Sequence, residues 1–505
     1  MSNLSSEVTK ETIAYLQKAT TTGVNSGTGY VSYDLDPRVI SLIPVVTPFR
    51  DFVSRKRATD GAKFAIWRAT MNATSSQPDP SMGFDYAAGA QTTIEQDFQA
   101  IYKPTGLSDS VTLDAINLAQ GLTDPYADAQ FRTLSNVLNG DDRKLIGAQS
   151  FALATTAAPT LVGGTSGSIG AVSSYWTAAP RTGSGYYYGS GNGRATASAV
   201  ITFGSGTTNS VTATVAATKG AVAYDWFYSA NGTSGWLYVT TTTVNTAVFK
   251  TIPTVNAAPP ALPGLSGMWK GTPINASTNP ITVNTAADNG SANANDYDGF
   301  LATITGDYNA SGQFVQAGTA TPNPAVWASN NGAALTLSGG TITEIVQNLF
   351  LPIYNQALVS PSVLMVNQAQ AYEIATLVLG STAATTFVST ASPDRISTTA
   401  GGRVGKIINP FASGSDGGIE VAIEVHPNVP PGTIIARTDE VPYPQANIDS
   451  VLEYRNLQDT QMFEYGTSLV PNQAGGGPRK QFELRSLGAF VNRAPVSMGV
   501  LQNVG

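Results

Sequence analysis

The sequence predicts an α+β chain that carries a separate all-β segment. Apolar residues recur at helical spacing after Asp124-Pro125, whereas residues from about Ala157 to Val255 alternate between apolar and polar side chains and carry almost no charge. Short strands and helices are mixed again after Asp296. Because 505 residues are too many for one hydrophobic core, these regions indicate several domains in one chain.

The composition excludes several classes of function. Only 12% of the residues are charged and 50 are glycines, which favours β-rich, loop-rich structure. The net charge of −7 argues against a general nucleic-acid binder, which would concentrate Lys and Arg against phosphates. The chain has no cysteine, which excludes disulfides, thiolate chemistry and the common zinc sites.

Residues 1–55 are expected to form an extended arm. They contain one short helix candidate, Ser6 to Lys18, and are otherwise rich in Gly and Thr. Such a segment cannot build a core, so it must lie on another surface. The N-terminus has no apolar run of signal-peptide length, and no window reaches the roughly 18 apolar residues of a membrane span. We therefore expect a protein made in the cytoplasm with no membrane partner.

Residues 56–105 are predicted to form a long hairpin that ends in an extended loop. Lys63 to Met71 and Gln91 to Tyr102 have the composition of strands, and the residues between them are rich in Pro, Gly, Ser and Asn. A two-stranded hairpin is only marginally stable in water. Its faces are therefore expected to need a partner.

Residues 106–156 are predicted to be helical. A short helix is expected within VTLDAINLAQGL, before Asp124 and Pro125, which together are typical of a helix start. From there one long amphipathic helix is expected to run to about Ala154, with Asn139-Gly140 as a candidate kink. Its apolar residues at helical spacing are Phe131, Leu134, Val137, Leu138, Leu145 and Ile146.

Residues 157–257 are predicted to fold as a separate β-sandwich. Five or more short strands, split by Gly, Ser and Asn turns, span about the length of an immunoglobulin-like or fibronectin-type module. One strand places Tyr224, Trp226 and Tyr228 on one face. A central Trp on a sandwich strand normally packs against the opposite sheet, so we expect a core here and not a sugar-binding platform. Asp225 and Phe227 occupy the other face of that strand, and Trp236 and Tyr238 alternate with Leu237 and Val239 on the next.

The second half of the chain is predicted to mix strands and helices after a loop-rich connecting segment, residues 258–295. Pro352 should kink the helix that follows Gly339-Gly340-Thr341, or end it early. The apolar strand SVLMVN leads into a helix from Gln368 to Leu379. The remaining residues are predicted to be strands and turns, apart from a polar, helix-like stretch from Gln445 to Gln461.

The sequence offers few residues for a catalytic site. His426 is the only histidine, and without a second His or Cys to act with it we expect a structural role at a turn or strand end. The glycines from Gly183 to Gly193 lie between predicted strands and not before a helix, so they do not predict a dinucleotide site. Among Asp225, Glu420 and Glu424, no spacing selects a carboxylate pair for glycoside chemistry.

Asp141-Asp142-Arg143-Lys144 mixes charges within the predicted long helix. It is expected to form a solvated or subunit-contacting face. No residue is therefore predicted to be catalytic, to bind a cofactor or to hold a metal, and no enzymatic activity is expected.

The order of the parts is similar to that of a known family. The residues that carry the similarity are QDFQAIYKPTGLSDSVTLDAI (Gln96 to Ile116), DYDGFLATI (Asp296 to Ile304), SPSVLMVNQAQAYEI (Ser360 to Ile374) and IEVHPNVPPGTIIARTDEVPYP (Ile423 to Pro444). Together they resemble the major capsid proteins of tailed bacteriophages, which have the Hong Kong ninety-seven-type capsid fold, also used by herpesvirus capsids. The resemblance spans about three quarters of the chain and contains no catalytic motif.

The resemblance implies a phage major capsid fold with an inserted immunoglobulin-like sandwich. The implied parts are an N-terminal arm (1–55), an extended loop that lies across a neighbouring subunit with its tip near Ser81 to Ala88 (56–105), a peripheral domain with its spine helix (106–156), the immunoglobulin-like insertion (157–257), a connecting segment (258–295), an axial domain (296–410) and C-terminal strands shared by the axial and peripheral domains (411–505).

The resemblance also implies a structural function. Copies of the chain would self-assemble as hexamers and pentamers into an icosahedral shell that encloses phage double-stranded DNA without reading its sequence. The protein would lie in the virion capsid after assembly in the bacterial host cytoplasm. A decoration or cement protein, a portal and a separate scaffolding protein are implied as further partners.

Two features of the family have no counterpart in the sequence. The arm begins almost at once, where some members carry a long charged scaffolding region, so scaffolding is expected from a separate protein or is absent. Lys63 and Lys103 lie in or near the extended loop, but no motif for a Lys–Asn crosslink accompanies them. Two other functions stay open: a bacterial surface or secreted adhesin with an immunoglobulin-like module, which would need the signal peptide that we do not find, and a glycan-cleaving enzyme.

Overall fold

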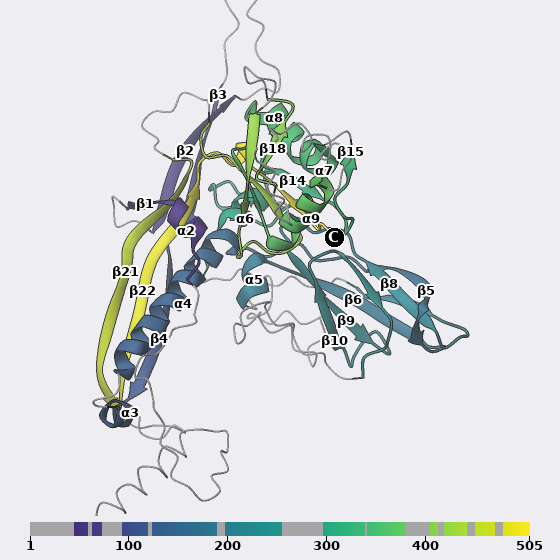
Figure 1. Ribbon diagram of the computed structural model, residues 1–505, viewed down its shortest axis with the longest axis horizontal. Coiled ribbons are helices and arrows are strands. Elements are labelled where there is room, and N and C mark those ends of the chain that lie inside the picture. Colours follow the sequence, from purple (N-terminus) through teal and green to yellow (C-terminus); the bar gives the residue numbers. More distant parts are fainter. Residues whose placement is uncertain are drawn as a thin grey trace, which may run out of the picture.

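A four-stranded sheet and the long helix α4 (Pro125–Gly147) form one elongated side of the molecule (Figure 1). The other side holds a six-stranded sheet with helices around it, and a further group of strands projects away from both. The structure is a computed structural model that describes residues 45–58, 63–72, 93–119, 124–188, 197–254, 296–338, 341–379, 404–412, 419–441, 450–469 and 478–505. The predicted helix at Ser6 to Lys18, the hairpin tip and the connecting segment lie outside these ranges.

Helix α4 begins where the local sequence predicts. The Asp124 carboxylate accepts two backbone N–H groups of the first turn, and Pro125 occupies that turn, where its missing N–H costs nothing. The helix continues through Asn139-Gly140, so the predicted long helix is confirmed, although it ends at Gly147 rather than near Ala154. The expected short helix before it is α3 (Leu113–Leu118).

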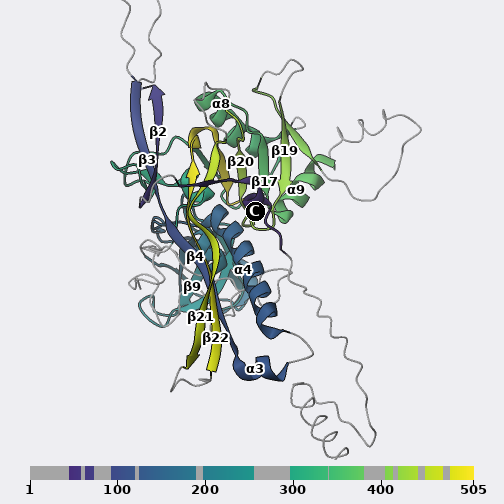
Figure 2. The ribbon, with the colours of Figure 1, turned by 90° about the vertical axis from the view of Figure 1, so that its left-hand side faces the viewer.

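The sheet beside α4 joins distant parts of the chain. Its order is β1 (Ser54–Arg57), β21 (Leu452–Leu469), β22 (Pro478–Asn492) and β4 (Lys103–Thr112). Strands β21 and β22 form a long antiparallel hairpin, β4 pairs antiparallel with β22, and β1 pairs parallel with β21. In Figure 2 these strands and α4 run side by side.

The prediction of a polar helix from Gln445 to Gln461 is wrong, because β21 begins at Leu452. The many charged residues of this stretch are typical of an exposed helix. The Glu453 carboxylate is nevertheless buried, and it pairs with Lys56 Nζ at 2.9 Å and with Arg493 Nη2 at 3.1 Å. Lys56 is 397 positions away in the sequence, and Arg493 is 40 positions away, at the end of the paired strand β22. Pairing partners therefore decide the structure here, and the local sequence does not show them.

The predicted long hairpin is confirmed as a two-stranded ribbon of β2 (Phe64–Asn72) and β3 (Thr93–Ile101). Strand β3 is followed almost directly by β4, so the ribbon and the four-stranded sheet are connected without a loop. Figure 2 shows the ribbon extending beyond the other strands at the top of the molecule. Within the described part of the ribbon, the buried side chains Ala65, Trp67, Phe98 and Ala100 lie at its base.

Six strands form a mixed sheet in the order β14 (Val326–Ser329), β23 (Gly499–Gln502), β20 (Ile434–Arg437), β17 (Val363–Val366), β19 (Ile419–Val425) and β18 (Lys406–Asn409). Met365 and Ile435 enter one hydrophobic core, whereas Leu364 and Ile434 enter another. Because neighbouring residues of a strand point to opposite faces, the sheet is buried on both sides.

Helices cover the two faces of this sheet. Helix α6 (Phe300–Thr305) packs in the first core; α7 (Thr343–Ile345), a π-helical turn (Val346–Phe350), α8 (Leu351–Ala357) and α9 (Gln368–Leu379) pack in the second. None of the helices in the described ranges is long and apolar enough to cross a membrane.

Pro352 does not end its helix, which continues to Ala357. The preceding turn is π-helical, with Leu351 N–H bonded to Val346 O. A proline inside a regular α-helix collides with the carbonyl four residues earlier, and a wider turn changes the position of that carbonyl. The expected disturbance therefore takes the form of a local change of winding.

The projecting strands form two antiparallel sheets packed face to face. One has the order β10 (Leu237–Thr242), β9 (Ala223–Ser229), β6 (Ser173–Arg181) and β7 (Ala199–Thr202); the other has β11 (Thr246–Phe249), β8 (Asn209–Thr214) and β5 (Thr160–Ile169). The Trp176 ring of one sheet stacks on Phe249 of the other with centroids 4.1 Å apart. The predicted β-sandwich is confirmed, and its assignment as immunoglobulin-like stays a prediction.

Replacing Trp226 tests whether the sandwich depends on its aromatic core. Trp226 is fully buried, and its Nε1 donates to Thr242 Oγ1 at 2.8 Å. We expect Trp226→Ala to destabilise the sandwich by about 3–5 kcal/mol, because a large cavity remains. Hydrogen exchange in β6 and β9 measures this loss. Val162→Ala, in the same sandwich but 59% exposed, should change exchange little; equal effects of the two substitutions would contradict the prediction.

Candidate interaction surfaces

The carboxylates considered for glycoside chemistry are not brought together. Asp225 lies in the sandwich and pairs with Arg181 Nε at 2.5 Å, whereas Glu420 and Glu424 lie on β19. Four residues along a strand separate those two by about 13 Å, beyond the roughly 5–10 Å of glycosidase carboxylate pairs. Each also has its own cation: Lys406 for Glu420, and Arg437 at 3.4 Å for Glu424. In the described ranges, no group of three or more His, Asp or Glu could hold a metal ion.

His426 has the predicted structural position at a strand end, directly after β19. It is fully buried, and its Nδ1 accepts the backbone N–H of Asn428 at 3.1 Å. Its Nε2 faces Asp142 Oδ2 at 3.4 Å. Burial, with a smaller contribution from Arg437, lowers the pKa of His426 to about 4, so the ring is neutral near pH 7.

The expectation that Asp141-Asp142-Arg143-Lys144 is a solvated or subunit-contacting face is wrong. Asp141 and Asp142 are buried where α4 meets the arm segment that contains Arg50. Asp141 Oδ2 pairs with Arg50 Nε at 3.0 Å and with Arg55 Nη2 at 2.5 Å. Asp142 accepts the Arg50 backbone N–H at 2.8 Å and the Asn428 amide at 2.6 Å.

The same four-residue stretch continues the polar joint on its other side. Arg143 Nε donates to Asn428 Oδ1 at 3.2 Å, and Lys144 Nζ pairs with Asp296 Oδ1 at 2.9 Å. The stretch is therefore an internal joint between α4, the arm and the six-stranded sheet. A mixed charge run is usually solvated, and this one differs because every charge has a partner from another segment.

The segment that begins at Gly183 contains helix α5 (Gly183–Tyr188), so the expectation of no helix there is wrong. Tyr186 and Tyr187 are buried in the core beside α4 and anchor this turn. The first glycine serves close packing, because a Cβ atom on Gly183 would lie 2.7 Å from the Cα atom of Gly147. Gly183 is thus required for close packing against the backbone at Gly147. The later glycines of the stretch, Gly189, Gly191 and Gly193, lie outside the described residues.

The aromatic residues of the sandwich are core, as predicted. Tyr224, Trp226 and Tyr228 lie between the two sheets. Phe227 packs with Trp236 and Tyr238 on the opposite face of the same sheet, and these side chains are buried too. The described residues therefore contain no aromatic platform in this stretch.

The base of the ribbon is clamped by a small hairpin of β12 (Asp307–Tyr308) and β13 (Phe314–Val315). Phe98 meets Tyr308 edge to face with centroids 4.6 Å apart, and Gln99 N–H donates to Gly312 O at 3.0 Å. Gly312 has a φ of 76°, and a Cβ atom there would lie 2.0 Å from Asp97 O. Only glycine allows this approach, so the clamp fixes where the ribbon leaves the core.

Outside the clamp, the ribbon keeps an exposed side. Ile66 is exposed, and Arg68 pairs with Asp97 at 2.6 Å and with Glu95 at 3.2 Å on the surface. Lys63 lies over the Phe64 ring at 5.4 Å. Exposed ion pairs contribute little to stability, so this side of the ribbon has little to hold it within one chain.

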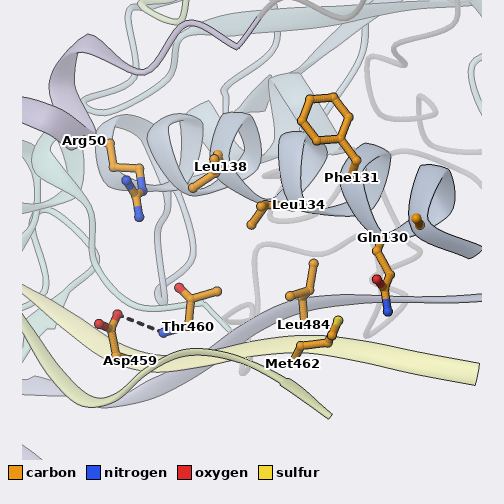
Figure 3. A pocket seen from close by; sticks show the side chains of 10 residues that line it. Arg50, Gln130, Phe131, Leu134, Leu138, Asp459, Thr460, Met462 and Leu484 are labelled. Atoms are coloured by element: carbon orange, nitrogen blue, oxygen red, sulfur yellow. Dashed lines mark hydrogen bonds between the residues drawn. The ribbon is translucent and has the colours of Figure 1, made fainter. Parts of the chain in front are cut away.

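A groove of about 640 Å³ lies between α4 and the β21–β22 hairpin (Figure 3). Phe131 and Leu134 line its helix side, and Met462 lines the strand side. Two apolar residues of the predicted helical pattern, Phe131 and Leu134, are 56% and 38% exposed. Helix α4 instead turns Thr133 and Val137 inward. The apolar side chains in the groove have no cover among the described residues.

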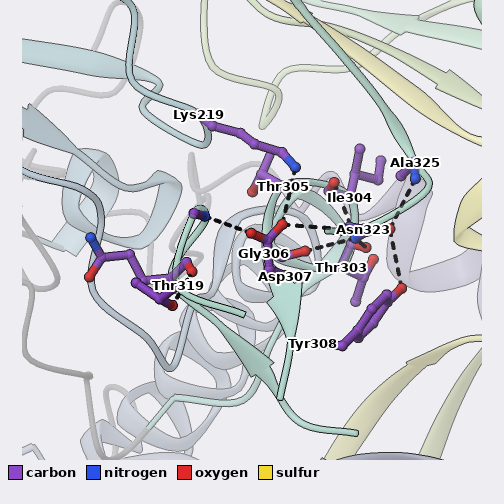
Figure 4. A network of polar contacts seen from close by, with 12 residues as sticks. Lys219, Thr303, Ile304, Thr305, Gly306, Asp307, Tyr308, Thr319, Asn323 and Ala325 are labelled. Carbon is purple, nitrogen blue, oxygen red and sulfur yellow. Dashed lines mark hydrogen bonds and ion pairs between the residues drawn. The ribbon is translucent and has the colours of Figure 1, made fainter. Parts of the chain in front are cut away.

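A buried polar network joins the sandwich to the rest of the chain (Figure 4). Asp307 Oδ1 pairs with Lys219 Nζ of the sandwich at 3.5 Å, and its other oxygen accepts Gly318 N–H at 2.6 Å. Asn323 donates to the carbonyls of Thr303 at 2.8 Å and Gly306 at 2.9 Å. The Lys219–Asp307 pair connects the sandwich to the ribbon clamp, and the other bonds fix the loops beside α6 and β12.

No protein-family model matches the sequence, and no curated protein matches it. Among solved structures, the chain is similar to the capsid of a native GTA particle (8% identity, 94% of this chain and 96% of that chain, TM-score 0.40), the capsid of cyanophage A-1(L) (10%, 94%, 97%, 0.41) and the capsid of the Myoviridae phage XM1 (7%, 95%, 100%, 0.38). These identities and TM-scores are low.

Substituting Gly312 tests the clamp. Gly312→Ala adds a Cβ atom against the Asp97 backbone and strains a left-handed residue, so we expect the ribbon base to loosen and its amides to exchange at least tenfold faster. Gly318→Ala is the matched control, because its φ is 82° but no atom lies within 4 Å of the added Cβ. Hydrogen exchange of β2 and β3 is the measurement, and equal rates in the two variants would show that the contact does not hold the ribbon.

The pH dependence of stability tests the joint at Asp142 and His426. Burial raises the pKa of Asp142 to about 6, so the folded state gains stability as the pH falls from 6 towards 4. The lowered pKa of His426 acts in the opposite direction between pH 6.5 and 4. Asp142→Asn removes the first effect, so its free energy of unfolding should fall between pH 6.5 and 4 by about 2–3 kcal/mol more than that of the parent chain. His426→Gln removes the second effect, so its free energy of unfolding should fall by less than that of the parent.

Chemical denaturation of the parent and both variants at pH 4, 5 and 6.5 measures these changes. The prediction concerns the difference in slope between variant and parent, so other titrating groups cancel. The same slope in all three chains would contradict it.

Proposed function

We propose that this chain is a structural major capsid protein that self-assembles as hexamers and pentamers into an icosahedral shell enclosing phage double-stranded DNA. The observation that carries the proposal is the ribbon, a long hairpin whose buried side chains, within the described residues, lie at its base. A two-stranded ribbon is marginal in water and gains burial when it lies on another subunit. The order of arm, hairpin, long helix and mixed sheet along the chain adds support.

Exposed apolar side chains support an assembly function further. They lie on the elongated sheet and on the ribbon: Ile66, Leu107, Phe463 and Tyr465. Large exposed apolar surfaces mark interaction sites in proteins. Only 12% of the residues of the chain are charged. This composition suits an assembly, because charged residues are rare in the cores of protein interfaces.

Each part then has a place in the shell. Residues 1–55 are the arm, residues 56–105 the extended loop across a neighbour, residues 106–156 the peripheral domain with α4 as its spine, and residues 296–410 the axial domain at the centre of each hexamer or pentamer. The sandwich, residues 157–257, is an inserted immunoglobulin-like domain; residues 258–295 connect it, and residues 411–505 are strands shared by the axial and peripheral domains.

The proposed function requires no catalytic residue and no cofactor. A chain with a net charge of −7 would enclose DNA without binding its phosphates tightly, because tight binding requires clustered Lys and Arg. Copies of the chain are its main partner, with a portal, a decoration protein and a scaffolding protein as further partners. Its location is the virion capsid, assembled in the bacterial host cytoplasm.

Assembly of the purified full chain tests this function. Sedimentation and electron microscopy should show closed shells, or rings of five and six copies. Replacing the ribbon beyond its base, residues 70–96, with a short Gly-Ser turn should abolish shells but leave a folded subunit, because the clamped base remains. Trp226→Ala is the matched control, since it disrupts only the sandwich and should still assemble. A stable monomer at high concentration would overturn the proposal and favour a surface adhesin.

A further inference from the structure

Helix α4 presents an apolar stripe to the groove beside it. Ala127, Phe131, Leu134 and Leu138 line the groove at intervals of three and four residues, and Met462, 44% exposed, lies opposite them. Such a stripe normally faces a partner. In Figure 3 Leu134 points between the helix and the strands, towards Met462 and Leu484.

The same face of α4 is already covered one turn further along. Asp141 and Asp142 follow Leu138 by three and four residues, so they continue the stripe. Both bind Arg50 of the short helix α2 (Pro48–Phe52), through Nε at 3.0 Å and through the backbone N–H at 2.8 Å. Arg50 also lines the end of the groove. The arm thus packs on the stripe up to the point where the groove begins.

Two hydrogen bonds set the direction of the arm along α4. Val46 N–H donates to Asn139 Oδ1 at 3.1 Å, and Arg50 N–H donates to Asp142 Oδ1 at 2.8 Å. Residue numbers rise in the same direction in both segments, so the arm runs parallel to the helix. The first described residues of the arm, at Val45 and Val46, therefore lie on the side of Arg50 that is nearer to the N-terminal half of α4, where the groove lies.

The sequence before Val45 matches the groove in length and chemistry. From Leu138 to Ala127 the groove extends about 17 Å along the helix, which about five extended residues span. The five preceding residues are Ile40-Ser41-Leu42-Ile43-Pro44, uncharged and mostly apolar. Pro44 restricts Ile43 to extended backbone, and in an extended segment Ile40 and Leu42 point to the same side.

We propose that residues 40–44 of the same chain occupy the groove between α4 and the β21–β22 hairpin, with Ile40 and Leu42 on Phe131, Leu134 and Met462. This inference does not rest on the proposed function, because it concerns a contact within one chain. The arm would then form a third side of the groove, beside α4 and the β21–β22 hairpin. It would cover the most exposed apolar residues of α4.

Disulfide trapping tests the proposal. Because the chain contains no cysteine, only the introduced pair can form a disulfide. Leu134→Cys is combined in turn with Ile40→Cys, Leu42→Cys or Ile43→Cys in the full chain, and each variant is oxidised mildly. At least one pair should form an efficient disulfide, which needs Cα atoms about 4.4–6.8 Å apart. Arg132→Cys with Leu42→Cys is the control, because Arg132 is exposed on another face of α4 and should not react.

Mixing isotope-labelled with unlabelled chains before oxidation identifies the occupant. Linked peptides that are all heavy or all light support the proposal. Mixed peptides overturn it, as does a link from Leu134→Cys to Ser81→Cys in the hairpin tip of another copy in place of a link to the arm. Failure of all three arm positions to react also overturns it.

A second measurement needs no cysteine. Leu42→Asp should release the segment and speed hydrogen exchange in residues 127–138 at least tenfold, whereas Leu4→Asp, the same change elsewhere in the arm, should leave it unaltered. Unchanged exchange in the Leu42→Asp chain overturns the proposal even if a variant in the trapping series fails to fold.

Discussion

Two adjacent carboxylates, Asp141 and Asp142, connect the main parts of the molecule. Asp141 binds the arm through Arg50 and Arg55, and Asp142 binds Arg50 and the Asn428 amide beyond β19. A buried carboxylate is costly unless all its partners are present. The arm, α4 and the six-stranded sheet must therefore come together in one arrangement, and the groove beside α4, which Arg50 lines, takes its position from it.

The other joints use charge in the same way. Glu453 connects β1 and β22 through Lys56 and Arg493, and Asp307 connects the sandwich to the ribbon clamp. Although the chain has few charged residues, several of them form ion pairs between its domains and segments. Its surface is left to hydroxyl, amide and apolar groups, which can be covered by another subunit without stripping water from ions.

Much of this architecture could be predicted from the sequence, because its signals are local. The Asp124-Pro125 start, the helical spacing of α4, the two ribbon strands and the alternation around Trp226 each depend on neighbours along the chain. The failures share another cause. The stretch at Asp141, the strand from Leu452 and the helix at Gly183 depend on partners hundreds of residues away or on a close backbone approach, and spacing carries no record of those. Periodicity likewise gave the stripe at Phe131 but not which side of α4 would be covered.

The pairing of β1 with β21 has a consequence for the time at which a subunit becomes complete. Lys56 and Glu453 are 397 positions apart, so a ribosome adding about 5–20 residues per second makes the second some 20–80 s after the first. During that interval the arm and the ribbon have been synthesised, but the sheet that anchors them does not yet exist. A nascent chain therefore cannot complete this four-stranded sheet until synthesis is almost finished.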